Sequence, residues 1–175
     1  MSNLAIEEIT SLLRDECVRD ITIVGCMDPT DVELEFYQFL KVLYLEFESR
    51  FVELSTSNES ARIQLRSVHE PYPHELEEGE RCAILKLGCL LLAQDEAQIS
   101  VTRVVLWDRV DEAQSTSCVA LRFELSTGQH LFFDCVGISE GIRFGGPQKE
   151  QLWSAWQAQP LLQSCVEIRG PDRAS

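Results

Sequence analysis

The amino-acid sequence predicts an α+β fold, mostly antiparallel sheet, with an N-terminal helix and a late helix packed on it. The main observation is a hairpin pattern of alternating apolar and polar residues that occurs twice. The first copy covers residues 43–54 and is followed by a strand at 62–68. The second covers 121–135 and is followed by a strand at 141–144. The other observation is the helical spacing of apolar residues near each end of the chain.

The length of the chain, 175 residues, suits a single domain covering 1–175. Folding at this size buries roughly 70% of the unfolded surface, so no disulfide or metal is needed. The repeated pattern also fits two pseudo-repeated β-meander halves, 21–70 and 98–146, with a C-terminal helix at 147–158. Because the halves match in pattern rather than in identity, a common topology without duplication is the alternative.

The first third of the chain predicts one helix and then strands. Apolar residues at helical spacing predict an amphipathic helix over 3–18, and residues 21–26 predict a short strand. Residues 32–45 fit both an alternating strand and a helical stripe. We favour strands there, because the sequence that follows alternates cleanly.

The first hairpin is assigned a register that buries one face. Placing Phe47 opposite Val52 and Leu45 opposite Leu54 brings all four apolar side chains to the same side of the sheet. The turn then falls at Ser49–Arg50.

The other face of this hairpin carries Glu46, Glu48 and Glu53, and the register sets Glu46 opposite Glu53. A face of this charge suits binding to a basic partner. The alternative is that nearby basic side chains of the same chain neutralise the glutamates. The strand at 62–68 turns Arg62 and Arg66 outward, where they can neutralise Glu53. We weight compensation above a binding patch.

The middle of the chain is a loop followed by strands. Prolines and a glycine predict a loop at 69–80. Residues 82–93 are nearly all apolar, which predicts a central strand covered on both faces, with a buried helix as the alternative. Residues 98–107 predict another strand and 108–117 a polar loop. The loop at 69–80 is the most acidic segment and contains Glu75, Glu77, Glu78 and Glu80.

The second hairpin is predicted from residues 119–125 and 130–135, joined by a three-residue loop at 127–129 that contains glycine. We expect the register of this hairpin to pair Arg122 with Asp134 across the outer face of the sheet.

The C-terminal part predicts a helix from Pro147 to about residue 157, an edge strand near 166–169 and a loose tail. The helix presents Trp153 and Trp156 at helical spacing. Tryptophan dominates the energetics of protein interfaces, so both are candidate anchors for a partner. Burial in the core is the interpretation that we favour for them.

The charge of −14, from 29 acidic and 15 basic residues, excludes some functions. It opposes binding to nucleic acid and to anionic membranes. It would attract a basic protein and accelerate its association. The alternative is that the acidity only maintains solubility.

The seven cysteines form no CxxC pair, and the chain opens without a secretory signal. Most lie in apolar strings, which predicts buried thiols in a reducing, cytoplasmic environment. No apolar run is long enough to span a membrane.

Catalytic and metal-binding patterns are weak. His130 and Asp134 share a strand face, and the assumed register puts Ser126 opposite His130, whereas Cys135 points the other way. No nucleophile elbow accompanies them. His69 and His74 flank the acidic loop without the spacing of a zinc site.

We therefore expect a non-enzymatic, acidic protein-binding module without a cofactor, such as a cytosolic immunity protein or inhibitor that neutralises a basic partner. The alternatives are a structural or self-assembling subunit, and a small hydrolase using the face of His130 and Asp134. The candidate protein-binding residues are Glu46, Glu48, Glu53, Glu75, Glu77, Glu78, Glu80, Trp153 and Trp156.

Overall fold

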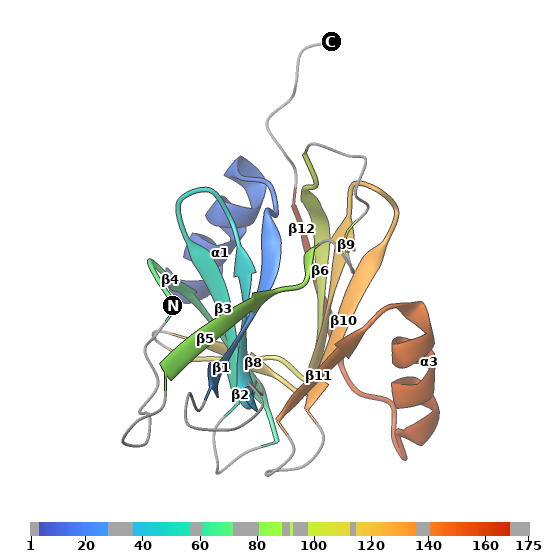
Figure 1. The fold of residues 1–175 in the computed structure, drawn as a ribbon. Coiled ribbons are helices and arrows are strands. Elements are labelled where there is room, and N and C mark those ends of the chain that lie inside the picture. The colour runs from blue at the N-terminus through green and yellow to red at the C-terminus, as the bar shows by residue number, and fades with distance from the viewer. Residues whose placement is uncertain are drawn as a thin grey trace.

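Two antiparallel sheets pack face to face in the computed structural model of the protein, with helices at one side and on one outer face (Figure 1). The structure describes residues 4–27, 37–56, 61–71, 81–88, 92, 98–112, 115–135 and 141–168. The predicted α+β class, with antiparallel sheet and an N-terminal and a late helix, is confirmed.

The larger sheet has seven strands in the order β5-β1-β2-β3-β4-β8-β7. These strands are β1 (Asp20–Met27), β2 (Tyr37–Glu46), β3 (Phe51–Thr56), β4 (Ile63–Val68), β5 (Arg81–Lys86), β7 (Val110–Asp111) and β8 (Thr116–Cys118). The smaller sheet has five strands in the order β11-β10-β9-β6-β12. They are β6 (Val101–Trp107), β9 (Ala120–Leu125), β10 (His130–Cys135), β11 (Ile142–Gly145) and β12 (Gln163–Glu167).

Each predicted hairpin with its following strand forms a three-stranded meander, and each meander lies in a different sheet. β2, β3 and β4 are neighbours in the larger sheet, and β9, β10 and β11 are neighbours in the smaller one. The common origin of the two halves stays a prediction.

The main core lies between the two sheets because alternate residues of each strand point inward. Leu45 and Leu54 of the larger sheet are fully buried, as are Phe123 and Phe133 of the smaller one. The two phenylalanine rings pack edge to face with centroids 5.9 Å apart. This alternation is what the sequence pattern predicted.

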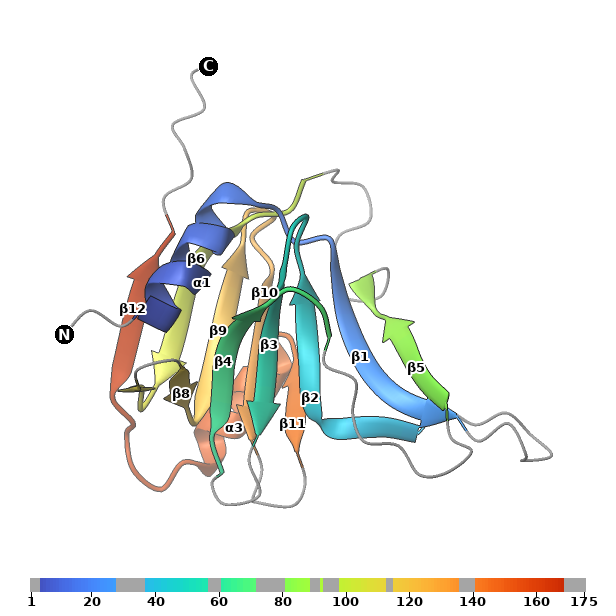
Figure 2. The ribbon, with the colours of Figure 1, turned by 90° about the vertical axis from the view of Figure 1, so that its left-hand side faces the viewer.

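Helix α1 (Leu4–Asp15) joins the sheets at one side of the sandwich (Figure 2). It contacts β4 of the larger sheet and β6 of the smaller one. Ile9, Leu12 and Leu13 lie on one face of the helix and are buried in the main core. The packing of this apolar face therefore stabilises a helix that would be marginal alone.

The predicted register of the first hairpin is wrong by two residues. Leu45 pairs with Val52, not with Leu54, so Glu46 does not face Glu53. The turn is instead closed by Phe47, whose N–H donates to the carbonyl oxygen of Arg50 at 2.9 Å. A shift of two residues keeps the same side chains inward, so alternation alone could not fix the register.

A distant residue holds that turn in place. The backbone N–H of Ser49 donates to a carboxylate oxygen of Glu16, just beyond α1, at 2.9 Å. Arg19 also pairs with Glu48 in the turn. These contacts come from about thirty residues away, beyond what a local sequence pattern can report.

The register of the second hairpin is also wrong by two residues, although its loop has the predicted length. Leu125 N–H donates to Gln129 O at 2.9 Å, and Gly128 N–H donates to Leu125 O at 3.0 Å. The loop is thus 126–128, and its last residue, Gly128, has φ +82°. Three-residue hairpin loops need a left-handed residue at this last position, which glycine supplies most easily. The prediction had placed Gly128 in the middle of the loop.

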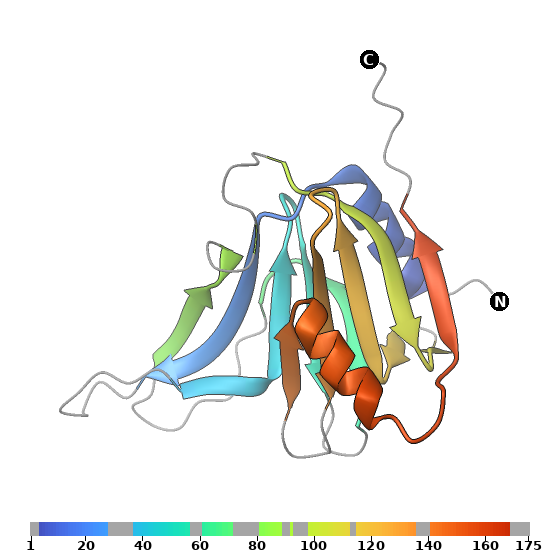
Figure 3. The same cartoon turned by 90° about the vertical axis from the view of Figure 1, so that its right-hand side faces the viewer.

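Two other expectations are corrected. Residues 82–86 do not form a central strand, because β5 pairs with β1 alone among the described strands. The larger sheet reaches past the smaller one at this end (Figures 2 and 3), and Ile84 and Leu85 are exposed. The segment 108–117 is also not entirely loop, since it contains β7 and the start of β8.

The segment 32–45, which fitted both a strand and a helix, is a strand in its described part. Residues 37–45 form strand β2, as favoured, whereas 32–36 lie outside the described residues. Within the described part of the chain, the helices are too short or too polar to cross a membrane.

Candidate functional site

The acidic residues of the first hairpin are compensated locally rather than gathered in a free patch. Glu53 is only 2% exposed and lies directly opposite Arg66 in the sheet. Arg66 donates to Glu53 Oε1 from Nη2 at 2.5 Å and from Nε at 3.2 Å. Arg62 pairs instead with Asp108, at 2.9 Å.

The two other glutamates of that face also have basic partners. Glu46 Oε2 accepts a hydrogen bond from Lys86 Nζ at 2.7 Å, and this bond raises the pKa of Lys86. Glu48 pairs with Arg19. The favoured interpretation, local compensation, therefore agrees with the ion pairs of the described residues. Glu75, Glu77, Glu78 and Glu80 lie outside those residues.

Helix α3 (Pro147–Trp156) packs on the outer face of the smaller sheet, against β10 and β11 (Figure 3). It begins with Pro147, whose fixed φ and missing N–H suit the first helical turn. Trp153 is 6% exposed and fills the contact. Its ring centroid lies 5.4 Å from that of Trp107 and 5.3 Å from that of Phe132. Trp153 is therefore a core residue of a second, smaller cluster.

Charged side chains surround this apolar contact and tie the helix to the sheet. Glu150 on α3 accepts a hydrogen bond from Arg122 of β9 at 2.7 Å. Arg122 also donates to Glu124 at 2.6 Å. His130 Nε2 lies 3.1 Å from the other oxygen of Glu150, without the alignment of a hydrogen bond.

The predicted Arg122–Asp134 pair is wrong. Asp134 has no exposed surface and lies opposite Arg143 of β11, which donates to it at 2.7 and 3.3 Å. Lys149 Nζ, from α3, lies 3.4 Å from the same carboxylate. Asp134 is thus held by two cations from a strand and a helix that follow it in the sequence, so the pairing depends on how α3 docks.

The groups that the hydrolase hypothesis requires are not brought together. His130 lies opposite Glu124, not Ser126, and contacts Glu150 rather than Asp134. Cys135 is buried in the main core, where desolvation raises the pKa of its thiol. A hydrolase activity stays a prediction without support from this geometry.

A metal site is not assembled in the described part of the chain, where no three His, Cys, Asp or Glu side chains gather closely enough to hold an ion. His69 is exposed, and His74 lies outside the described residues.

The second half of α3 and the segment after it form an uncharged run of the sequence with exposed apolar side chains. No Asp, Glu, Lys or Arg occurs between Glu150 and Glu167, although the chain carries a net charge of −14. Three large apolar side chains are exposed there: Leu152 at 58%, Trp156 at 70% and Leu162 at 79%. We call Leu152 and Trp156, which lie four residues apart on the same side of the helix, the α3 surface. The uncharged run was visible in the sequence, but its exposure was not.

The expectation that Trp156 is buried in the core is wrong, since its side chain is 70% exposed, but the ring is nevertheless held in place. The guanidinium carbon of Arg143 lies 5.9 Å from the centre of the Trp156 ring, a distance typical of a cation–π contact. Arg143 is itself fixed by its bonds to buried Asp134. The ring therefore rests on a side chain that is anchored in the sheet.

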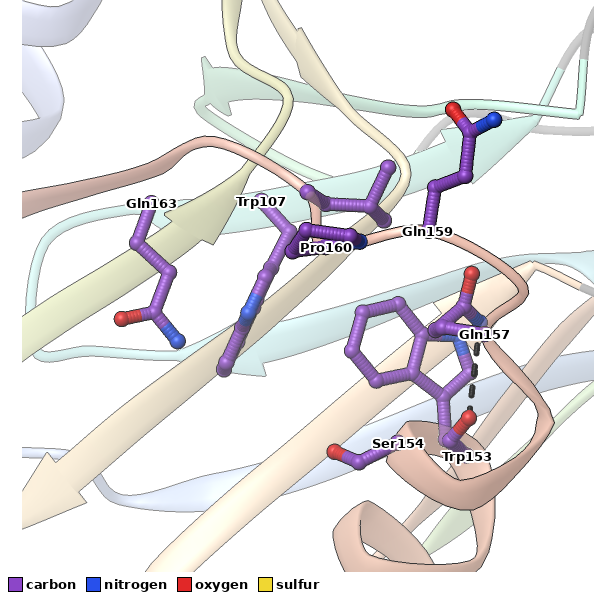
Figure 4. A pocket seen from close by; sticks show the side chains of 8 residues that line it. Trp107, Trp153, Ser154, Gln157, Gln159, Pro160 and Gln163 are labelled. Carbon is purple, nitrogen blue, oxygen red and sulfur yellow. Dashed lines mark hydrogen bonds between the residues drawn. The ribbon is translucent and has the colours of Figure 1, made fainter.

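A small hollow lies beside the α3 surface, between the end of α3 and the segment that leads into β12 (Figure 4). Its volume is about 200 Å³. Ligand pockets usually measure about 300–1,000 Å³, so this hollow suits a single side chain better than a cofactor. Its walls are aromatic, amide and proline groups, from Trp107, Trp153, Ser154, Gln157, Gln159, Pro160, Leu161 and Gln163.

Comparison of the chain with protein-family models, with curated proteins and with solved structures finds no match. The function is therefore argued from the chemistry of the α3 surface itself.

Proposed function

We propose that the protein is a non-enzymatic protein-binding module that contacts its partner through the α3 surface. The observation that carries the proposal is the exposure of Leu152 and Trp156 on the same side of α3, within an uncharged run of a strongly acidic chain. The central parts of protein interfaces are depleted of charged residues and enriched in aromatic ones. Exposed apolar residues grouped in this way commonly mark a contact surface.

The position of Trp156 suits an interface anchor. Tryptophan is the residue type most enriched among binding hot spots. Since Arg143 already supports one face of its ring, Trp156 loses little conformational freedom when a partner covers it. Preorganisation of this kind raises affinity by lowering the entropic cost of binding. The adjacent hollow can receive one side chain of the partner in return.

The partner that fits this protein is a basic protein with an apolar pocket at its contact surface. The net charge of −14 attracts such a partner over long range, even though Glu46, Glu48 and Glu53 are paired locally. An inhibitor or immunity protein that neutralises a basic partner in the cytoplasm is the particular form that the small size and acidity favour. In this form charge accelerates the encounter and the α3 surface supplies the affinity.

The test compares two substitutions of exposed apolar residues at opposite ends of the molecule. Tagged wild-type protein, Trp156→Ala and Ile84→Ala are used to capture partners from the source-cell lysate, and the captured partner is then titrated by calorimetry. We expect Trp156→Ala to weaken binding by about 2 kcal/mol or more, roughly thirtyfold, as for a hot spot. Ile84→Ala should bind as the wild type does.

Salt dependence separates the two parts of the proposal. Higher salt should slow association of a basic partner and leave its dissociation rate nearly unchanged, because the exposed side chains of the α3 surface are apolar. Equal binding by wild type and Trp156→Ala would refute the assignment of the α3 surface. Absence of any stoichiometric partner would refute the protein-binding function.

A second candidate, a self-assembling subunit, is favoured by the exposed edge strand β5. Ile84 and Leu85 are 55% and 45% exposed, and exposed apolar edge strands tend to pair with further strands. A mass in solution that rises with concentration and returns to the monomer value in Ile84→Lys would support this candidate over the first.

A further inference from the structure

Two cysteines face each other across neighbouring strands at the β5 end of the larger sheet. Cys26 of β1 is the direct partner of Cys82 of β5 in the antiparallel register. Residues directly opposite each other in such a pair point to the same face of the sheet. Both cysteines are present as reduced thiols.

The hydrogen bonding of the ladder defines the kind of position that they occupy. Leu87 N–H donates to Ile21 O at 2.7 Å, so these two residues form a hydrogen-bonded pair. Hydrogen-bonded and non-hydrogen-bonded pairs alternate along an antiparallel ladder. The register between β1 and β5 runs without a shift from Thr22 to Met27. Cys26, five residues beyond Ile21, therefore belongs to a non-hydrogen-bonded pair.

This position brings the two thiols within bonding reach. Non-hydrogen-bonded pairs have Cα atoms about 4.5 Å apart, and their side chains lie closer together than those of hydrogen-bonded pairs. Disulfides span Cα separations of about 4.4–6.8 Å, so a bond fits near the short end of that range.

The exposures of the two cysteines differ in a way that suits stepwise oxidation. Contrary to the expectation of a buried thiol, Cys82 is exposed and open to small molecules, whereas Cys26 is 5% exposed. The other cysteines with a partner in the sheet face residues that carry no thiol. Cys118 lies opposite Ile63, Cys135 opposite Ile142 and Cys165 opposite Val105.

We propose that Cys26 and Cys82 are a redox-active dithiol that reacts with low-molecular-weight disulfides to form an intramolecular disulfide between β1 and β5. The Cys82 thiolate attacks one sulfur of the small disulfide, whose S–S bond breaks, and one small thiolate leaves and takes up a proton. Cys26 then loses its proton to solvent and attacks the Cys82 sulfur, which releases the second small thiol. The protein loses two thiols as one external disulfide is reduced to two thiols.

β5 is paired with β1 along its whole length, and the bond would add a covalent link near its start. The contacts described at the opposite end are the Lys86–Glu46 ion pair at 2.7 Å and the bond from Gly88 N–H to Asp20 Oδ1, also 2.7 Å. Cys82 lies at the start of β5, away from both. Oxidation therefore fastens the edge strand to β1 at both ends. Because Cys82 is exposed, small thiols can reach the bond and reduce it again.

The test treats the folded full-length protein with glutathione disulfide near pH 8, followed by acid quenching and non-reducing peptide mapping by mass spectrometry. We expect a peptide that links Cys26 to Cys82, with no glutathione left on Cys82. Cys165, which is exposed and has no thiol opposite, is the internal control and should retain glutathione. In Cys26→Ala, glutathione should stay on Cys82. Amide exchange at the start of β5 should slow by roughly tenfold or more on oxidation.

Three outcomes would overturn the proposal. One is glutathione retained on Cys82 in the wild type to the same extent as in Cys26→Ala. Another is a disulfide that joins Cys82 to a cysteine other than Cys26. The third is a Cys82 that stays unmodified while Cys165 reacts. The contrast between Cys82 and Cys165 in the wild type decides the matter even if Cys26→Ala does not fold. None of these results depends on the α3 surface.

Discussion

Replacement of Trp153 by alanine tests whether one side chain holds α3 on the sheet. A tryptophan buries about 150–250 Å². At about 25 cal/mol per Å² this corresponds to roughly 4–6 kcal/mol, and measured Trp→Ala losses are about 3–5 kcal/mol. Trp153 is 6% exposed and packs on the rings of Trp107 and Phe132. Because a hollow of about 200 Å³ lies beside it, its neighbours can relax, and we expect the lower end, about 3 kcal/mol.

The assay is urea unfolding followed by circular dichroism, together with native-state hydrogen exchange of the α3 amides. The matched control is Trp156→Ala, three residues further along the same helix, where the side chain is 70% exposed. That variant should lose less than about 1 kcal/mol. If α3 detaches as a unit in Trp153→Ala, its amides will exchange freely while the sheets stay protected. Unchanged stability together with unchanged α3 exchange would refute the reasoning.

Three further predictions concern stability. Arg66→Ala should destabilise the protein by about 2 kcal/mol, because it leaves the Glu53 carboxylate buried without its partner. In a double-mutant cycle measured by urea unfolding, Glu53→Gln should recover part of this loss. Additive effects of the two substitutions would contradict the pairing. Burial raises the pKa of the Cys118 thiol from about 9 to about 12. The contribution of this thiol to the free energy of unfolding is therefore fully present below pH 9 and falls above it, where the thiol releases its proton in the unfolded chain but not in the folded one. The loss should be about 1.4 kcal/mol per pH unit towards pH 12 relative to Cys118→Val, and identical pH profiles would disprove it. Gly128→Ala should cost about 1 kcal/mol in thermal unfolding, because φ is +82° in open space, and Gly128→Asn should cost less.

Local patterns determined which segments form helices and strands. The alternation in residues 43–54 and 121–135 predicted two hairpins, and each is present with its following strand in a separate sheet. Pro147 and the helical spacing after it predicted α3. These signals are reliable because the face on which a side chain lies depends only on the geometry of its own element.

Long-range contacts determined the registers and the charge pairs. A slip of two residues leaves the same side chains inward, so contacts such as that of Glu16 with the first turn, and the left-handed conformation of Gly128, help to select the observed pairing. Likewise, Asp134 and Arg122 received different partners once α3 brought Lys149 and Glu150 to the sheet. The sequence contains all of these residues but not the distances between them.

The candidate site shows the same division. The sequence by itself determined that Trp153 and Trp156 are neighbours on one helix and that no charge follows them until Glu167. Only the tertiary structure decided that Trp153 is buried and Trp156 exposed. The physical reason is that side chains three residues apart on a helix point in adjacent but different directions. The docking of α3 on the smaller sheet selects which of the two side chains faces the protein. That selection places Trp156 on the surface from which the function is proposed.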